Sequence, residues 1–285
     1  MQEAIAVLPY GKTLGAKSST LNLDDLEWPM GRPERLRSGT LADLDATDHL
    51  FVFPKTSTHF KWNWGTKAKI SLMIVEPREI HLRHLRLLNF SGHRFHRIFT
   101  HDEKTLRRFS NARFLSPAST WVADFADLKI QKTADVSLIA SNNKSLVGHR
   151  MRHDLIDMLR DAGVNIDIIG RGFKPFDQKS EGLAPYRFSV VIENVSSPSY
   201  FTEKIVDSLL CETIPIYWGA PNIGSFFDSD AMLVCETLED FMAAIIGADQ
   251  DLYEEMKPAL MRAKAQAIAL REYRIMAAEI IQDEA

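Results

Sequence analysis

The chain has 285 residues, of which 45% are hydrophobic and 25% are charged, and its formal net charge is −4. This composition is ordinary for a globular protein, and the length suggests two domains. A negative net charge provides no global attraction to nucleic acid or to an anionic membrane, so any attraction to phosphate must be local. Two cysteines, Cys211 and Cys235, are too few for a disulfide framework and favour a reducing compartment.

The start of the chain and its hydropathy indicate where the protein acts. Residues 1–9 contain an acidic residue and an apolar run that is too short for a signal peptide. No segment reaches the 18 apolar residues of a membrane span. We therefore expect a cytoplasmic protein with at most peripheral membrane contact.

Strands and helices alternate along the first part of the chain, which predicts a parallel sheet. The apolar runs at 49–53 and 70–75 each end at a proline-containing turn, and 79–88 has the broad apolar face of a helix. The pattern loosens at 117–133, where we expect a linker. Strands are predicted at 3–8, 49–53, 70–75 and 95–100, and helices at 79–88 and 103–108.

The same alternation returns after the linker and predicts a second parallel sheet. Strands are predicted at 136–140, 166–169, 188–192, 214–218 and 232–234, and helices at 151–162, 202–210, 238–246 and from 252 to the C-terminus. We therefore predict an α/β fold with two Rossmann-like parallel-sheet domains facing a cleft. The N-terminal domain is expected at 1–125, and the C-terminal domain, with its last helix, at 126–285.

The most informative segment, 186–221, has the pattern strand, polar loop, helix, strand. The first strand ends at a carboxylate and an amide, and the loop leads into a helix with apolar residues on one side. Open α/β sheets bind ligands beyond the carboxyl ends of their strands. Five polar residues are predicted to meet there: Glu193, Asn194, Tyr200, Glu203 and Lys204.

Lys204 departs from a local rule. Thr202 is a suitable N-cap, which places Lys204 in the first helical turn, where a cation opposes the helix dipole. Either the side chain bends back into solvent, or an anion sits at this helix end and makes the cation favourable. The crowding of Asn194, Tyr200 and Glu203 in the same loop favours an anion site, most simply for a phosphate.

These residues also carry a resemblance to a known family. The groups Glu193-Asn194, Tyr200 to Lys204 and Ile214 to Gly219 resemble the signature of the α-1,3-fucosyltransferases, glycosyltransferase family 10. A weaker match includes the segment that begins at Arg152 and the turn at 170–172, so the similarity covers about residues 134–245. The first 120 residues resemble the family only in general style.

The resemblance implies a GT-B architecture and a specific reaction. It implies transfer of L-fucose from GDP-β-L-fucose to a hydroxyl of a glycan or lipopolysaccharide-type acceptor, by one displacement with inversion. The C-terminal domain is expected to bind the donor and the N-terminal domain the acceptor. Arg152, Lys204 and a helix N-terminus would hold the diphosphate, with Glu193, Asn194 and Tyr200 in the donor site, and Glu203 would face the sugar ring.

The general base is assigned by strand order. Glu76 follows an apolar strand of the N-terminal half, where the family has a Glu at a strand end, although the local residues here are Glu76-Pro77-Arg78. The alternative is a turn carboxylate paired with Arg78. His101 and Asp102 at the next strand end are the second choice for the base.

We expect neither a metal nor a nucleic-acid partner. The signature segment contains no Asp-x-Asp motif, and cations are available for the diphosphate. The histidine pairs 81/84 and 93/96 have a metal-like spacing, but interleaved arginines repel a dication, so a basic surface that meets an anionic acceptor is the better interpretation. The segment 11–18 nearly matches a P-loop but has Ala16 at the second glycine, which favours a loop.

Two other functions stay open. One is a related transferase that uses another sugar nucleotide, because the signature recognises the diphosphate and sugar ring more clearly than the base. The other is a non-catalytic protein that binds a sugar nucleotide or a glycan.

Overall fold

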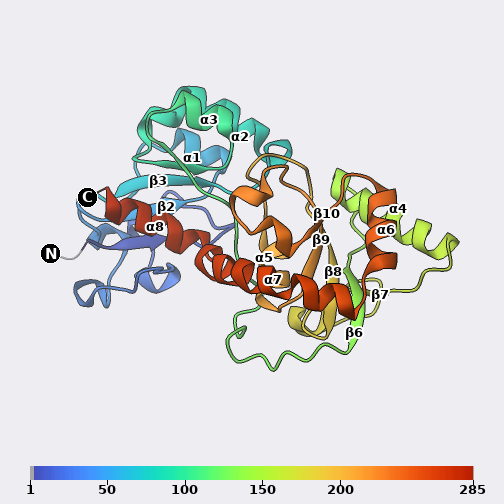
Figure 1. Ribbon diagram of the computed structural model, residues 1–285. Helices are drawn as coiled ribbons and strands as arrows, with labels where there is room; N and C mark the ends of the chain where they lie inside the picture. The colour runs from blue at the N-terminus through green and yellow to red at the C-terminus, as the bar shows by residue number, and fades with distance from the viewer. Residues whose placement is uncertain (1–2, 285) are drawn as a thin grey trace. The chain divides into compact units, whose positions relative to one another are not determined.

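The structure is a computed structural model that describes residues 3–284. The chain forms two compact α/β units (Figure 1). The first comprises Met1–Pro117 together with Tyr273–Ala285, and the second comprises Ala118–Glu272.

The first unit is built on a five-stranded sheet whose strands follow one another in chain order, and every pair is parallel. Parallel neighbours need crossover connections, and these are right-handed in nearly all proteins. Because each crossover steps in the same direction, all of them lie on the same face of the sheet. The strands are β1 (Ile5–Val7), β2 (His49–Val52), β3 (Lys69–Ile74), β4 (Ile98–Thr100) and β5 (Ala112–Phe114).

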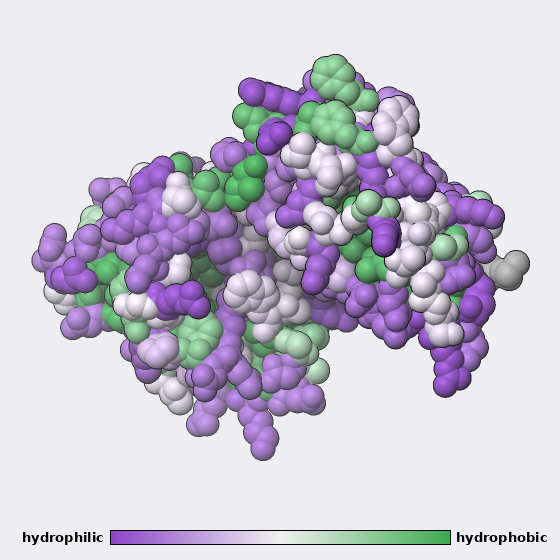
Figure 2. Space-filling model, turned by 180° about the vertical axis from the view of Figure 1, so that it is seen from behind, coloured by the Kyte–Doolittle hydropathy of each residue, from purple (hydrophilic) through white to green (hydrophobic). Residues whose placement is uncertain are grey.

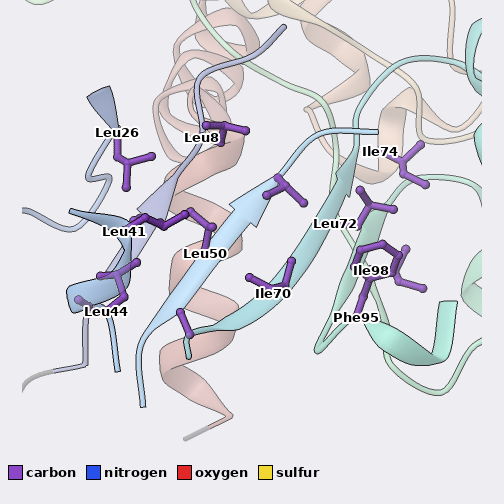
Figure 3. Close-up of a cluster of buried hydrophobic side chains, with 14 of the residues drawn as sticks. Leu8, Leu26, Leu41, Leu44, Leu50, Ile70, Leu72, Ile74, Phe95 and Ile98 are labelled. Carbon is purple, nitrogen blue, oxygen red and sulfur yellow. The ribbon is translucent and has the colours of Figure 1, made fainter. Parts of the chain in front are cut away.

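The crossovers bury one face of this sheet (Figure 3). Alternate strand residues such as Leu50, Leu72 and Ile98 point to this face, as the two-residue period of a strand requires. They pack with Leu41 from the β1–β2 connection and Leu88 from α2. The crossover helices are α1 (Thr56–Phe60), α2 (Arg78–Ser91) and α3 (Glu103–Arg108), and the β1–β2 connection contains the 3₁₀ turns Ser18–Thr20, Leu23–Asp25, Glu34–Leu36 and Leu41–Asp43.

The opposite face of the first sheet is covered by the C-terminal helix α8 (Tyr273–Asp283), which lies beside β1 and β2 in Figure 1. Tyr273, Ala277 and Ile281 recur at helical spacing and pack against Phe51 and Phe99 of the strands. We expected this segment in the second domain. It belongs to the first unit because a sheet wound in one direction leaves an apolar face that no crossover covers.

The second unit has a five-stranded parallel sheet in the order β10-β9-β8-β6-β7. The chain leaves β6 toward β7 and then returns to the other side of β6 to form β8, so the winding direction reverses between β6 and β8. The strands are β6 (Ala134–Ile139), β7 (Asp167–Ile169), β8 (Tyr186–Ile192), β9 (Ile214–Trp218) and β10 (Leu233–Val234), and the helices are α4 (Val147–Asp161), α5 (Glu203–Leu210), α6 (Leu238–Gly247) and α7 (Gln250–Leu270).

The predicted fold class, with two parallel-sheet α/β domains, is confirmed. Two elements were not predicted, the short helix α1 and the edge strand β5. Helix α4 begins four residues before its predicted start, because the ring nitrogen of His149 accepts the backbone N–H of Leu146 and caps the first turn. Within residues 3–284, no helix is both long and apolar enough to cross a membrane.

Candidate functional site

The candidate site lies where the winding of the second sheet reverses, at the carboxyl ends of β6 and β8. Such a switch point is where open α/β sheets bind ligands. Helix α4 follows β6 and starts directly against the end of β8, where Gly148 donates its N–H to the carbonyl of Asn194 at 3.0 Å. A Cβ at Gly148 would lie 1.7 Å from the carbonyl oxygen of Glu193, so only glycine permits this approach.

Glu193, the carboxylate at the end of β8, is fully buried and holds the start of α5. Its two carboxylate oxygens accept the backbone N–H and the hydroxyl of Thr202, each at 2.8 Å. Thr202 is the N-cap of α5, as the sequence predicted. Glu193 therefore fixes the loop between β8 and α5 and directs the first turn of α5 toward the switch point.

Lys204 lies in that first turn and is paired with two carboxylates. Its Nζ is 3.5 Å from Oε2 of Glu193 and 3.3 Å from Oε1 of Glu203. The side chain keeps 23% of its surface exposed, and its ammonium group also donates to the hydroxyl of Thr202 at 3.0 Å. The alternative in which Lys204 bends back into solvent is therefore wrong, because its ammonium group pairs with two carboxylates.

The pairing continues on the other side of Glu203. Nζ of Lys179, in the 3₁₀ turn Lys179–Gly182, is 3.7 Å from Glu203 and 2.8 Å from Asp207. Asp207 also accepts hydrogen bonds from the hydroxyl of Thr120 and the backbone N–H of Trp121. Five buried or half-buried charges thus alternate in sign, in the order Glu193, Lys204, Glu203, Lys179 and Asp207. We call this set the ion-pair chain.

The ion pairs outweigh the effect of burial on the pKa values of Glu203 and Lys204. Burial alone would raise the pKa of Glu203, but Lys204 and Lys179 outweigh it and lower that pKa to about 2. Burial would lower the pKa of Lys204, but Glu193 and Glu203 raise it above its usual value. At Asp207 burial dominates, and its pKa is raised although Lys179 opposes the change. Glu203 is therefore an ionised carboxylate at neutral pH.

Arg152 adds a buried cation at the switch point. It projects from α4 and donates from Nη2 to the carbonyl of Ile192, with a longer contact of 3.5 Å to Oδ1 of Asn194. Burial lowers its pKa, and the charges of Glu193 and Glu203 oppose this change. Arg152, Glu193, Asn194, Glu203 and Lys204 are therefore brought together, as the sequence predicted. Tyr200 also lies close to Arg152, but its side chain is buried.

Three residues of this site were missed by the sequence analysis: Lys179, Asp207 and His149. A signal for two of them exists in the sequence. Glu203 and Asp207 are four residues apart on α5, which places two carboxylates on one helix face and demands a cation between them. That cation, Lys179, comes from a turn 24 residues earlier, and its side chain lies over the ring of Trp121. His149 lies near Arg152 and Lys204, and burial and these two cations lower its pKa.

Glu76 lies in the first unit, just after β3, and is half-buried. Its Oε1 accepts a hydrogen bond from the hydroxyl of Tyr10 at 3.1 Å. Burial and the neighbouring Glu76 raise the pKa of Tyr10 to about 12, so the phenol stays protonated as a donor. The alternative pairing with Arg78 is not what the structure shows, because Arg78 binds Asp102 at 2.6 Å.

His101 and Asp102, the second choice for the base, have structural roles in this unit. Asp102 is the N-cap of α3 and accepts from Thr105, besides its pair with Arg78. His101 is buried, and burial lowers its pKa to about 4. Glu76 and Asp102 are both half-buried, but among the described residues Glu76 has only the hydrogen bond from Tyr10, whereas Asp102 is bound to Thr105 and Arg78.

The other motifs do not form the sites that their spacing suggested. Residues 11–18 form turns without an α-helix behind them, which agrees with the loop interpretation. Asp-x-Asp triplets do occur outside the signature, at 43–45, 228–230 and 249–251, and their side chains accept bonds at turns and helix starts. Across residues 3–284 there is no group of three His, Cys, Asp or Glu side chains placed to hold a metal.

Comparison with known proteins finds a similarity to one family within the second unit. Residues 129–253 match the model of the family described as "Glycosyltransferase family 10 (fucosyltransferase) C-term". This range contains Arg152 and every member of the ion-pair chain. Residues 129–253 are therefore similar to the C-terminal part of this family, and they make up less than half of the chain. Glu76 and the rest of the first unit lie outside the match.

Part of this chain is also similar to individual fucosyltransferases. An alpha-(1,3)-fucosyltransferase of Helicobacter pylori is 30% identical over 116 residues, which cover 40% of this chain and 24% of that protein. A putative fucosyltransferase-like protein of Arabidopsis thaliana is 30% identical over 115 residues, 39% of this chain and 22% of that protein. The matched region therefore spans about a quarter of the length of these relatives.

The fold is shared with a solved glycosyltransferase. An alpha-glucosyltransferase in complex with UDP and a mismatched DNA duplex aligns over 85% of this chain and 80% of its own, with a TM-score of 0.56 and 13% identity. At this identity the likeness concerns the fold alone. It agrees with the predicted fold of two parallel-sheet α/β domains.

Proposed function

We propose that this protein is an inverting fucosyltransferase that transfers L-fucose from GDP-β-L-fucose to a hydroxyl of a glycan acceptor. The observation that carries the proposal is the ion-pair chain at the switch point of the second sheet, within the range that matches the family 10 model. It combines the ammonium of a partly exposed lysine, a buried guanidinium and a carboxylate that stays ionised. These are the groups that departure of a nucleoside diphosphate from a sugar requires.

The donor half of the mechanism follows from Lys204. In this structure its charge is balanced by Glu193 and Glu203. A diphosphate at the start of α5 would attract the same ammonium, together with the backbone N–H groups of the helix end and Arg152. As Lys204 turns to the phosphate, its hold on Glu203 weakens. The negative charge of Glu203 then becomes available to the positive charge that develops on the sugar ring.

The acceptor half uses Glu76 as general base. Its carboxylate takes the proton of the acceptor hydroxyl as that oxygen attacks the anomeric carbon, and GDP leaves from the opposite side, which inverts the configuration. The hydrogen bond from Tyr10 orients this carboxylate. Because Arg152 and Lys204 supply positive charge to the leaving group, we propose that no metal is required.

Two measurements test the proposal. Calorimetric titration with GDP, UDP and ADP should give the tightest binding for GDP, and a chelator should leave it unchanged. Equal affinity for UDP would favour a transferase that uses another sugar nucleotide. A screen of GDP-fucose transfer over a glycan array should then identify the acceptor. GDP binding without either transfer or donor hydrolysis would favour a binding protein.

A further inference from the structure

A cluster of exposed aromatic side chains lies on the first unit, away from the residues assigned above. Trp62 is 85% exposed, Phe90 is 77% exposed and Phe60 is 59% exposed. Rings of this size normally bury most of their surface, and three of them within one region mark an interaction site.

Contacts between the two chain segments place these rings together. The carbonyls of His59 and Lys61, which flank Phe60, both accept hydrogen bonds from the guanidinium of Arg94. The same guanidinium lies 4.6 Å from the ring centre of Trp62. The ring of His59 bonds Ser91, the neighbour of Phe90, at 2.8 Å. The segment 59–62 is thereby fixed beside the C-terminal end of α2.

Helix α2 continues the apolar surface toward its start. Ile80, Leu87 and Phe90 follow the spacing that aligns side chains along one stripe of a helix, and Arg83 lies on the same stripe. Ile80 is exposed and Leu87 is half-buried. In Figure 2, green and white side chains stand beside purple ones along the upper edge of this unit, which Figure 1 shows to be formed by α2 and α3.

The region is also strongly basic in an acidic chain. Residues 54–97 contain nine Lys or Arg and two Glu, a net charge of +7, whereas the whole chain carries −4. Among the residues that the structure describes, Lys61, Arg83, Arg86 and Arg94 form no ion pair with a carboxylate. We call Phe60, Trp62, Ile80 and Phe90 with these four cations the aromatic–basic surface.

We propose that the aromatic–basic surface binds the headgroup layer of an anionic phospholipid membrane. Unpaired cations are attracted by the negative surface potential, and tryptophan and phenylalanine side chains enter the boundary between headgroups and acyl chains. The aliphatic Ile80 and Leu87 favour lipid over a sugar or a nucleic acid, since an aliphatic side chain does not stack on bases or hydrogen-bond a glycan. Because Arg94 fixes the segment 59–62, less conformational entropy is lost when the aromatic side chains bind.

Flotation of the full chain with vesicles tests this proposal. Vesicles of phosphatidylcholine containing about one third phosphatidylglycerol should bind the protein, and added salt should weaken this binding. Vesicles of phosphatidylcholine alone should bind it roughly tenfold less. Equal binding to both vesicles, or to neither, would overturn the proposal.

Two double variants assign the binding to this surface. Trp62→Ala with Phe90→Ala, and separately Arg83→Glu with Arg86→Glu, should each reduce binding to anionic vesicles by roughly tenfold or more. The matched controls are Val234→Ala with Ile246→Ala, two exposed apolar residues of the second unit, and Arg107→Glu with Arg108→Glu on α3, which changes the net charge equally. The controls should bind as the native chain does. Vesicle binding that survives both surface variants would contradict the assignment.

The same protein preparation distinguishes lipid from two other occupants of the aromatic–basic surface, a second copy of this chain and a polyanion. If light scattering shows a dimer that the Trp62 and Phe90 substitutions dissociate, the surface is a contact between copies of this chain and the proposal fails. If heparin displaces the protein from vesicles and binds it with equal affinity, and the aromatic variant keeps that affinity, the surface recognises polyanions and not lipid. Unchanged thermal midpoints of the variants would show that lost binding is not lost folding.

Discussion

The two units bury titratable side chains in different ways. In the second unit, buried carboxylates and lysine ammonium groups alternate, so that each has a neighbour of opposite sign, and Glu203 stays ionised. The first unit instead buries histidines, among them His59, His81 and His101, whose pKa values are each lowered to about 4 by burial. These rings are neutral at neutral pH.

The difference follows from topology. The second sheet reverses its winding between β6 and β8, which opens a place where charged side chains from α4, α5 and the strand ends can meet a ligand. The first sheet winds in one direction and has no such reversal. At its strand ends Glu76 and Asp102 are half-buried, and His101 is buried. The contrast predicts ligand binding by charged side chains in the second unit and sensitivity to acid in the first.

The largest effects should come from one carboxylate in each unit. Glu76→Gln should reduce transfer by about 10²–10⁴-fold, the usual range for a general base, and leave donor binding nearly unchanged. Its pH–rate profile should also lose the acidic limb. Glu203→Gln should reduce turnover with only a modest change in GDP affinity, because GDP lacks the sugar. Steady-state kinetics and calorimetry measure both effects, and Glu239→Gln on the exposed side of α6 is the control. Near-native transfer by Glu76→Gln would show that another group is the base.

Removal of Lys204 should affect both binding and folding. Lys204→Ala should weaken GDP binding by roughly ten- to a hundredfold, because a charge-assisted bond to the diphosphate is lost. It should also destabilise the second unit by about 3–5 kcal/mol, because Glu193 and Glu203 lose their shared cation.

A second variant separates these two effects of Lys204. Adding Glu193→Gln to Lys204→Ala removes one uncompensated charge and should restore part of the stability, measured by denaturant unfolding, but not the GDP affinity. A double variant that recovers GDP affinity would show that Lys204 does not contact the diphosphate.

Acid should weaken the first unit before the second. The buried histidines bind protons more weakly in the folded than in the unfolded chain, so their contribution to stability is lost as the pH falls from 6.5 toward 4. At about pH 5 each buried histidine can reduce the free energy of unfolding by up to about 2 kcal/mol. Glu203, whose pKa is lowered to about 2, loses its contribution only below its unfolded pKa of 4.5.

Amide exchange resolved by unit measures this difference in acid sensitivity. Lowering the pH from neutrality to about 5 should increase opening in β2, α1 and α2, whereas β8 and α5 keep their protection. Substitution of the exposed His93 by Asn should leave the profile unchanged. Earlier loss of protection in α5 would reverse the comparison.

The smallest effect concerns the hydrogen bond to Glu76. Tyr10→Phe should reduce turnover by roughly three- to tenfold, because the carboxylate loses the hydrogen bond that orients it. Tyr186→Phe removes a similar bond, from a tyrosine to Asp167 at 2.9 Å, outside the proposed site. Steady-state kinetics of the two variants measure the difference, and the control should keep its native turnover. Native turnover in Tyr10→Phe would contradict the role of Tyr10.

Much of the fold was accessible from the sequence because its signals are local. Apolar runs bounded by turn residues located β2, β3, β8 and β9 within one or two residues, and α3 was predicted over its observed range. The short helix α1 and the strand β5 were missed because elements of three to five residues carry too little periodicity. The observed end of the second unit was also missed, since a continuous helical pattern at the C-terminus does not show that the last helix packs on another sheet.

By itself, the sequence determined which residues share the edge of the second sheet, because a strand end, a fixed loop length and a helix N-cap place Glu193, Glu203 and Lys204 within one short βαβ segment. Only the tertiary structure decided how their charges are balanced. Lys179 reaches Asp207 from a distant turn, and Arg94 holds the segment 59–62 against α2. Such pairings depend on distances between segments that the chain brings together only when its cores form, and no periodicity along the sequence records them.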